Sequence, residues 1–157
     1  MRIGAKYDIL GTMNETLSSI KRKYRGKKAR FLGVDFGEAR VGLALSDEGR
    51  VIASPLAVVP MPSAFRVIEE TIARENVVLV VVGLPLTMKG EEGAAAERAR
   101  EFAAKIKGAP VLFADERLTS KLAERMLADA GVVRRNRTGT TDMIAAARIL
   151  QDVLDSP

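Results

Sequence analysis

The chain has 157 residues, 47% of them hydrophobic, which is enough to bury the core of one domain. It contains no cysteine and no histidine, which excludes disulfides, thiolate or imidazole metal ligands, and catalysis by a cysteine nucleophile or a histidine base. Carboxylates remain as metal ligands, and they suit hard cations such as Mg²⁺ and Mn²⁺.

The formal net charge of +5 is divided unevenly along the chain. Residues 1–30 hold nine Lys/Arg and two Asp/Glu, whereas residues 31–157 hold sixteen and eighteen, so the body is slightly acidic. We therefore predict a basic N-terminal extension at 1–30 and one domain at 31–157. A basic arm on such a body favours a polyanionic partner. Without an apolar run of 18 residues or a signal-peptide core, we expect a soluble, cytoplasmic protein.

The extension carries an apolar stripe at spacings of three and four, which predicts an amphipathic helix: Leu10, Met13, Leu17, Ile20 and Tyr24. A basic run follows, and its cations are candidate contacts to nucleic-acid phosphates: Lys21, Arg22, Lys23, Arg25, Lys27 and Lys28. The alternatives are a disordered, solvated tail, or an over-long start ahead of a later methionine. The stripe permits a homodimer without requiring one, so both a monomer and a homodimer stay open.

The stretch Phe31–Asp47, FLGVDFGEARVGLALSD, alternates with period two on both sides of a glycine-bearing turn, which predicts a β-hairpin. Asp35 breaks the pattern, because a half-buried carboxylate costs free energy unless it meets a cation or hydrogen-bond donors. Gly33, Gly37 and Gly42 around it leave room for a ligand or another backbone. Asp35 is therefore either a turn cap or a functional carboxylate.

After the hairpin, the sequence predicts strands at Arg50–Val59, Val77–Val82 and Pro110–Ala114, and helices at Ser63–Asn76, from Glu91 to Gly108, from Thr119 to Gly131 and from Thr140 to Leu154. The β-branched run at Val77–Val82 is typical of a strand covered on both faces. The order of these elements indicates one α/β domain.

Two further carboxylates stand out by their positions. Glu116 leaves the end of a strand, where ligands bind in open α/β sheets, unless it is an exposed partner of Arg117 or Lys121. Asp142 falls on the inward face of the last helix, where it needs a cation or donors, unless it only favours the helix dipole. With Asp35, these acids could hold two divalent ions that activate a water in phosphodiester cleavage.

Four segments resemble, in order and spacing, the YqgF or RuvX family of RNase H-like proteins, a family of Holliday junction resolvase-like proteins and pre-16S rRNA nucleases: GVDFGEARVGLALSD, VVGLPLTMKGEEG, ADERLTS and TDMIAAARILQDVLD. The resemblance covers essentially all of 31–157. It implies an RNase H-like fold with a mixed five-stranded sheet, three antiparallel strands first and then two parallel, flanked by helices. It also implies phosphodiester hydrolysis dependent on Mg²⁺ or Mn²⁺, with Asp35, Glu116 and Asp142 as the catalytic and metal-binding acids.

We therefore predict a nuclease that acts on structured nucleic acid, by resemblance in processing the 5′ end of pre-16S rRNA, in cleaving branched DNA, or in both. Its domain offers further candidate phosphate contacts at Arg40, Arg117, Lys121, Arg134, Arg135 and Arg137. Aromatic residues are only 4%, which argues against a base-stacking platform. Two alternatives stay open: a non-catalytic nucleic-acid-binding module in ribosome assembly, and a nucleotide-binding phosphotransferase domain like those of actin and sugar kinases.

Overall fold

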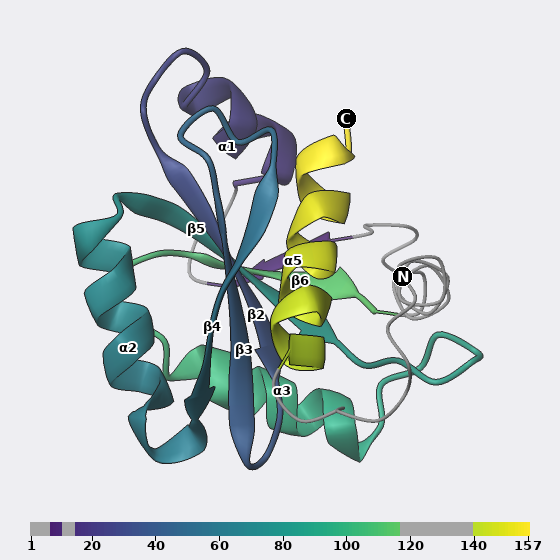
Figure 1. The fold of residues 1–157 in the computed structure, drawn as a ribbon. Helices are drawn as coiled ribbons and strands as arrows, with labels where there is room; N and C mark the ends of the chain where they lie inside the picture. The colour runs from purple at the N-terminus through teal and green to yellow at the C-terminus, as the bar shows by residue number, and fades with distance from the viewer. Residues whose placement is uncertain (1–6, 11–14, 117–139) are drawn as a thin grey trace, which may run out of the picture.

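The structure is a computed structural model that describes residues 7–10, 15–116 and 140–157. A six-stranded sheet forms its centre, with strand order β1-β6-β5-β2-β3-β4 (Figure 1). Its strands are β1 (Tyr7–Leu10), β2 (Arg30–Phe36), β3 (Arg40–Ser46), β4 (Ala53–Pro60), β5 (Val77–Leu84) and β6 (Val111–Asp115). The described helices are α1 (Leu17–Lys23), α2 (Met61–Arg74), α3 (Ala94–Ala104) and α5 (Thr140–Asp155).

Strands β2 to β6 confirm the mixed five-stranded sheet expected of an RNase H-like domain. β2, β3 and β4 pair antiparallel, β5 pairs parallel with β2, and β6 pairs parallel with β5. The short turn after β2 allows only an antiparallel return, whereas the helical crossovers through α2 and α3 bring the next strands back parallel. All but one residue of β5 are buried, as its continuous apolar run predicted.

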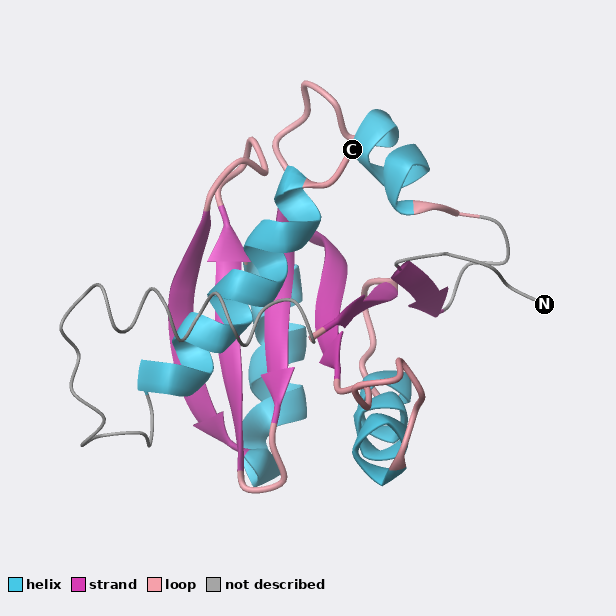
Figure 2. Ribbon diagram, turned by 90° about the vertical axis from the view of Figure 1, so that its right-hand side faces the viewer, coloured by secondary structure: helices cyan, strands magenta, loops and turns pink. Residues whose placement is uncertain are grey.

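Helices cover both faces of this sheet (Figures 1 and 2). One core cluster packs α2 and α3 against side chains such as Leu32, Val34 and Val80. The other packs α1 and α5 against Phe31, Leu79 and their neighbours on the opposite face. The period-two alternation along β2 therefore sends successive side chains into two separate cores.

The N-terminal extension is built into the sheet and one of the cores. Strand β1 pairs antiparallel with β6 and adds a sixth strand at the edge, in place of the helix predicted around Leu10. Thr16 caps α1 through a reciprocal hydrogen-bond pair with Ser19, which is why the helix begins at Leu17. Leu17 and Ile20 are buried beside α5, which confirms part of the predicted apolar stripe.

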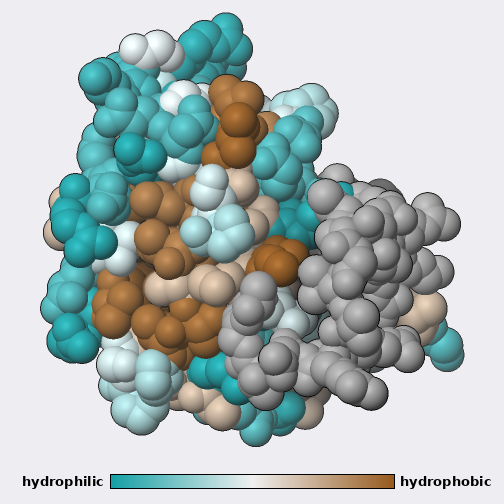
Figure 3. Space-filling model, in the orientation of Figure 1, coloured by the Kyte–Doolittle hydropathy of each residue, from teal (hydrophilic) through white to brown (hydrophobic). Residues whose placement is uncertain are grey.

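On the face drawn in Figure 3, apolar side chains gather over β4 and between β4 and α2. Val51, Ile52 and Leu56 are 64%, 61% and 37% exposed. No helix in the described part of the chain is both long and apolar enough to cross a membrane. The helix predicted from Thr119 to Gly131 lies outside the described residues.

Candidate active site

The three predicted acids lie at the carboxyl ends of β2 and β6 and at the beginning of α5. Asp35 is the second-to-last residue of β2, and Glu116 directly follows β6. Because β2, β5 and β6 are parallel, their carboxyl ends meet at the same edge. Helix α5 begins at this edge, so Asp142 lies in its first turn.

Helix α5 can approach the sheet closely because glycines lie beneath it. An ideal Cβ at Gly42 would lie 2.1 Å from the carbonyl oxygen of Asp142, and one at Gly33 would lie 2.7 Å from that of Ala146. Any side chain at Gly42 would therefore push the first turn of α5 away from β3. Since Gly42 is the register partner of Asp35, this contact fixes Asp142 beside Asp35.

A third glycine makes room for Glu116. An ideal Cβ at Gly83, on β5, would lie 2.2 Å from Oε1 of Glu116, so the carboxylate fills the space that a side chain would take. Gly83 follows Val82, the register partner of Val34 on β2. The Glu116 carboxylate thus lies over the strand next to Asp35.

The electrostatics of the site reflect this convergence. Burial raises the pKa of Asp35 from 3.8 to about 7, and repulsion from Glu116 and Asp142 adds to the shift. Burial also raises the pKa of Glu116, with a contribution from the neighbouring Asp115. The protein therefore holds several carboxylates together in a partly buried place where their mutual repulsion is unfavourable.

Arg40 supplies a cation at the edge of this group. Its Nε donates to Oδ2 of Asp142 at 2.6 Å, between side chains that are 39% and 25% exposed. A pocket of about 270 Å³ opens here, lined by Asp35, residues 36–39, Arg40 and Asp142. A ligand in this pocket would meet two of the acids and the guanidinium together.

The acids fit a divalent cation by donor type and charge. Within residues 7–10, 15–116 and 140–157, no three acidic side chains already stand as a ligand group around one point, and Asp142 is turned to Arg40. Carboxylate oxygens are nevertheless the preferred ligands of Mg²⁺ and Mn²⁺. A cation would also relieve the repulsion that raises the pKa of Asp35.

The other predicted contacts are placed differently. Five lie outside the described residues: Arg117, Lys121, Arg134, Arg135 and Arg137. Those of the extension, at 21–28, lie at the opposite end of the sheet, where β2 begins (Figures 1 and 2). Among them Lys21 donates to the carbonyl oxygens of Leu154 and Ser156, so it binds the end of α5.

Two features of the site were missed by sequence reasoning. The pairing of Arg40 with Asp142 joins residues 102 positions apart, and only the fold brings them together. The role of Gly83 had a signal, since a glycine ended an otherwise β-branched run beside the strand that leads to Glu116. Such a glycine indicates that another group approaches the backbone.

Comparison with known proteins places residues 29–156 in the family model described as RuvX: Holliday junction resolvase. A protein of Roseiflexus sp. (strain RS-1), named "Putative pre-16S rRNA nuclease", is 42% identical over 133 residues, 81% of this chain and 94% of the relative. A protein of Chloroflexus aggregans with the same name is 44% identical over 131 residues, 80% of this chain and 92% of the relative. The T. thermophilus RuvC structure in complex with Holliday junction substrate is 17% identical, with a TM-score of 0.48, over 80% of this chain and 93% of that chain.

Proposed function

The chain belongs to the RuvX family, described as Holliday junction resolvase, and we propose that it is a metal-dependent nuclease that hydrolyses phosphodiester bonds in structured nucleic acid. The names of the relatives point to the precursor of 16S rRNA as substrate, and the family description points to branched DNA. The observation that carries the proposal is the convergence of the three acids: Asp142 packs on Gly42, the register partner of Asp35, and Glu116 lies over Gly83 on the neighbouring strand. The raised pKa of Asp35, caused by burial and by repulsion from Glu116 and Asp142, agrees with this convergence.

In this proposal Asp35, Glu116 and Asp142 hold one or two divalent ions, Mg²⁺ or Mn²⁺. Bound ions would supply the Lewis acidity that activates a water and stabilises the leaving oxygen. The protein's own part is to fix the acids, through the close packing at Gly42 and Gly83, and to keep them partly buried. Partial burial strengthens their interaction with cations relative to water.

Arg40 can bind either Asp142 or a phosphate group of the substrate. It pairs with Asp142 and it lines the pocket, so its guanidinium can also donate to a phosphate oxygen of the substrate. A cation bound by Asp142 would weaken the hold of that carboxylate on Arg40. Arg40 is therefore proposed as a phosphate contact that orients the scissile group.

The remaining assignments belong to the same proposal. Residues 31–157 form the nuclease domain and residues 1–30 an extension. The phosphate contacts include Arg117, Lys121, Arg134, Arg135 and Arg137, and the protein acts in the cytoplasm as a monomer or homodimer. The five contacts share a positive charge, and in the sequence they all come after β6 and Glu116.

A matched pair of variants on one helix tests the nuclease. Asp142→Asn removes a proposed metal ligand in the first turn of α5, whereas Asp155→Asn makes the same change at an exposed position at its other end. We expect Asp142→Asn to lower cleavage of a labelled pre-16S rRNA fragment or a four-way DNA junction by about a thousandfold, because a bound ion contributes several kcal/mol to such reactions. Asp155→Asn should cut at the parental rate.

Binding of the same substrates serves as the second readout. Asp142→Asn should bind them with nearly parental affinity, since it removes a metal ligand and not a phosphate contact. Equal cleavage by the two variants would show that the acids do not act as proposed. Binding with no cleavage of either substrate by the parental protein, in Mg²⁺ or Mn²⁺, would favour a non-catalytic module.

A further inference from the structure

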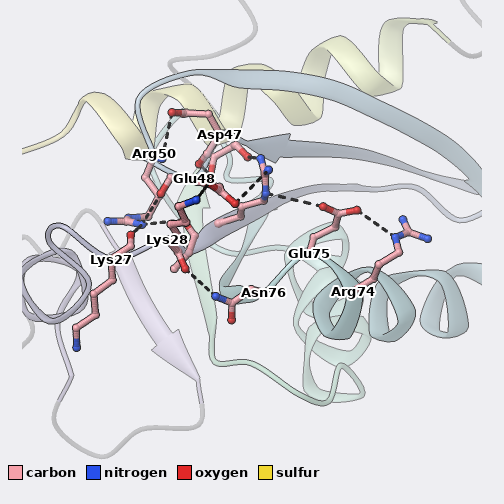
Figure 4. A network of polar contacts seen from close by, with 12 residues as sticks. Lys27, Lys28, Asp47, Glu48, Arg50, Arg74, Glu75 and Asn76 are labelled. Atoms are coloured by element: carbon pink, nitrogen blue, oxygen red, sulfur yellow. Dashed lines mark hydrogen bonds and ion pairs between the residues drawn. The ribbon is translucent and has the colours of Figure 1, made fainter.

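The segment between α1 and β2 is held in place by side chains from two turns of the domain. Arg50, in the turn between β3 and β4, donates to the backbone carbonyls of Tyr24, Lys27 and Ala29 at 2.6, 3.1 and 2.7 Å (Figure 4). Asn76, between α2 and β5, donates from Nδ2 to the carbonyl of Lys28 at 2.7 Å. Four carbonyls of this short segment are thus bound by the domain.

The two residues that hold the segment also share an unusual backbone. Arg50 and Asn76, with φ of 56° and 50°, are the non-glycine residues of positive φ in the described part of the chain. This left-handed conformation is unfavourable for residues with a Cβ, and it persists where surrounding contacts impose it. Here both instances direct a side chain to the same segment, which indicates that its fixed conformation serves a purpose.

Asp47 supports Arg50 from within its turn. Its carboxylate accepts hydrogen bonds from the backbone N–H groups of Gly49, Val51 and Ile52 at 3.1, 2.7 and 2.8 Å. These bonds lower the pKa of Asp47, because they favour the ionised form. The turn that presents the Arg50 guanidinium is therefore itself fixed by several contacts.

Cationic side chains of this segment and of the last turn of α1 are exposed to solvent. We call these five side chains the cationic platform: Arg22 and Lys23 of α1, and Arg25, Lys27 and Lys28 of the segment. Lys23 and Lys28 have a carboxylate within 3.3 and 3.7 Å, both in exposed ion pairs. Arg22, Arg25 and Lys27 have no carboxylate within ion-pair distance among the described residues, so no ion pair neutralises their charge there.

The platform lies at the end of the sheet opposite the acids. Strand β2 begins at Arg30, next to the platform, and carries Asp35 near its other end (Figures 1 and 2). At about 3.3 Å per strand residue, Arg30 and Asp35 are roughly 17 Å apart along β2. That span corresponds to about five steps of one nucleic-acid strand at about 3.4 Å each.

We propose that the cationic platform is a second phosphate-binding surface, which anchors the backbone of the same nucleic acid whose bond is cut at the acids. The proposal rests on the proposed function for the identity of this nucleic acid. A surface fixed before binding loses little conformational freedom, so its cations can replace counterions at low cost. Only substrates that extend at least about six nucleotides from the cleaved bond reach both surfaces.

The matched variants neutralise three exposed cations each. The platform variant is Arg22→Gln, Arg25→Gln and Lys27→Gln; the control is Arg66→Gln, Lys105→Gln and Lys107→Gln, on α2 and after α3. Affinity is measured by fluorescence anisotropy against salt, with a duplex of about 20 base pairs and a hairpin of about four. The platform variant should bind the long duplex more weakly, with a salt slope lower by up to about 0.9 per lost contact. Its affinity for the short hairpin should match the control.

Two outcomes would overturn the platform: equal losses of affinity on long and short substrates, or losses no larger than those of the control. Asn76→Gly provides an independent variant, because it removes the hydrogen bond to Lys28 without changing charge and leaves a residue that tolerates positive φ. It should bind the long duplex more weakly than the parent by a smaller factor than the triple variant. Parental affinity in Asn76→Gly would show that a fixed segment is not needed.

Measurements of cleavage test the proposed nuclease activity independently of the cationic platform. If the parental protein cuts the short substrate and the platform variant cuts it equally well, the nuclease stands whatever the long substrate does. If no protein cuts either substrate but the platform variant still loses affinity for the long duplex, the platform stands and the nuclease fails.

Discussion

Charged side chains at the two ends of the central sheet differ in how far they are buried. At the carboxyl ends of the strands, Asp35 and Glu116 are partly buried, and burial raises the pKa of both. At the amino end, the cations at 22–28 are exposed, while the backbone of the segment between α1 and β2 is bound to the domain through Arg50 and Asn76. At the carboxyl end the protein therefore holds carboxylates where burial disfavours their ionised form. At the amino end it fixes the backbone and leaves the cationic side chains exposed to water.

This difference separates two kinds of interaction with a ligand. Partly buried carboxylates interact strongly with a cation and are screened little by salt, so their effect is local and chemical. Solvated cations are individually weak and strongly screened, so they act through number and position. Variants of the acids at the carboxyl end should change stability and chemistry, whereas variants of the exposed cations at the amino end should change salt-dependent affinity.

The largest effect expected is on the stability of the protein as a function of pH. The pKa of Asp35 is raised from 3.8 to about 7 in the folded protein, so the folded state binds more protons than the unfolded state between these values. The free energy of unfolding should therefore fall as pH rises from about 4 to about 7, by roughly 4 kcal/mol from this group. Asp35→Asn should remove this fall and be more stable than the parent at pH 8.

Denaturant unfolding at pH 4, 6 and 8 measures the free energy of unfolding of each protein. Asp155→Asn is the control and should show the same dependence on pH as the parent. Added Mg²⁺ should stabilise the parental protein most at pH 8, where Asp35 is ionised, and should stabilise Asp35→Asn less. If the free energy of unfolding depended on pH in the same way in the parent and in Asp35→Asn, the fold would not disfavour the ionised form of Asp35.

The second effect concerns the packing that places Asp142. Gly42→Ala places a Cβ only 2.1 Å from the carbonyl oxygen of Asp142, so α5 must move away from β3. We expect a loss of about 3 kcal/mol in stability, the upper end for overpacking, together with weaker Mn²⁺ binding by calorimetry. Gly93→Ala is the control, because an added Cβ there meets nothing within 4 Å. Unchanged Mn²⁺ binding in Gly42→Ala would show that the metal site does not depend on the packing of α5 against Gly42.

The sequence was informative where the structure depends on local patterns. Period-two alternation predicted the hairpin of β2 and β3, a continuous apolar run predicted the buried β5, and helical periodicity placed Asp142 on the inward face of α5. The turn after β3 is local in the same sense, because Asp47 accepts hydrogen bonds from the N–H groups of Val51 and Ile52. Each of these features is decided by residues close together in the chain.

The features that sequence reasoning missed depend on contacts between distant segments. β1 pairs with β6 across about a hundred residues, and no pattern within Tyr7–Leu10 identifies that partner. The contact of the Lys21 ammonium with the carbonyls of Leu154 and Ser156, at the end of α5, also joins segments far apart in the chain. Likewise, Arg50 could not be assigned to the basic segment, because the contact depends on how the β3–β4 turn lies against it.

A third effect tests the amino end of the sheet. Arg50→Gly removes the guanidinium that binds the carbonyls of Tyr24, Lys27 and Ala29 but leaves a residue suited to positive φ. We expect a loss of about 1–2 kcal/mol in stability, since exposed or partly buried hydrogen bonds from a charged group each contribute modestly. Hydrogen exchange should be faster in residues 24–29 and unchanged in β5. A loss of protection across the whole sheet would show that Arg50 stabilises the core instead.

The smallest expected effect belongs to Arg40, where the two kinds of charge meet. Arg40→Gln removes a partly exposed ion pair with Asp142, so stability should fall by less than about 1 kcal/mol. The loss of a cation next to Asp142 leaves the acid group more negative, so Mn²⁺ should bind more tightly, by up to about fivefold at an interaction of about 1 kcal/mol. Cleavage should nevertheless slow, because the same guanidinium is the proposed phosphate contact.

Calorimetry of Mn²⁺ and single-turnover cleavage measure these two quantities separately, with Arg66→Gln as the control on α2. A weaker affinity for Mn²⁺ together with slower cleavage would mean that Arg40 supports the acids and does not compete with the ion. Tighter binding with unchanged cleavage would remove Arg40 from the phosphate contacts. Only opposite changes in the two measurements agree with a guanidinium that pairs with Asp142 in the absence of a cation and with phosphate in its presence.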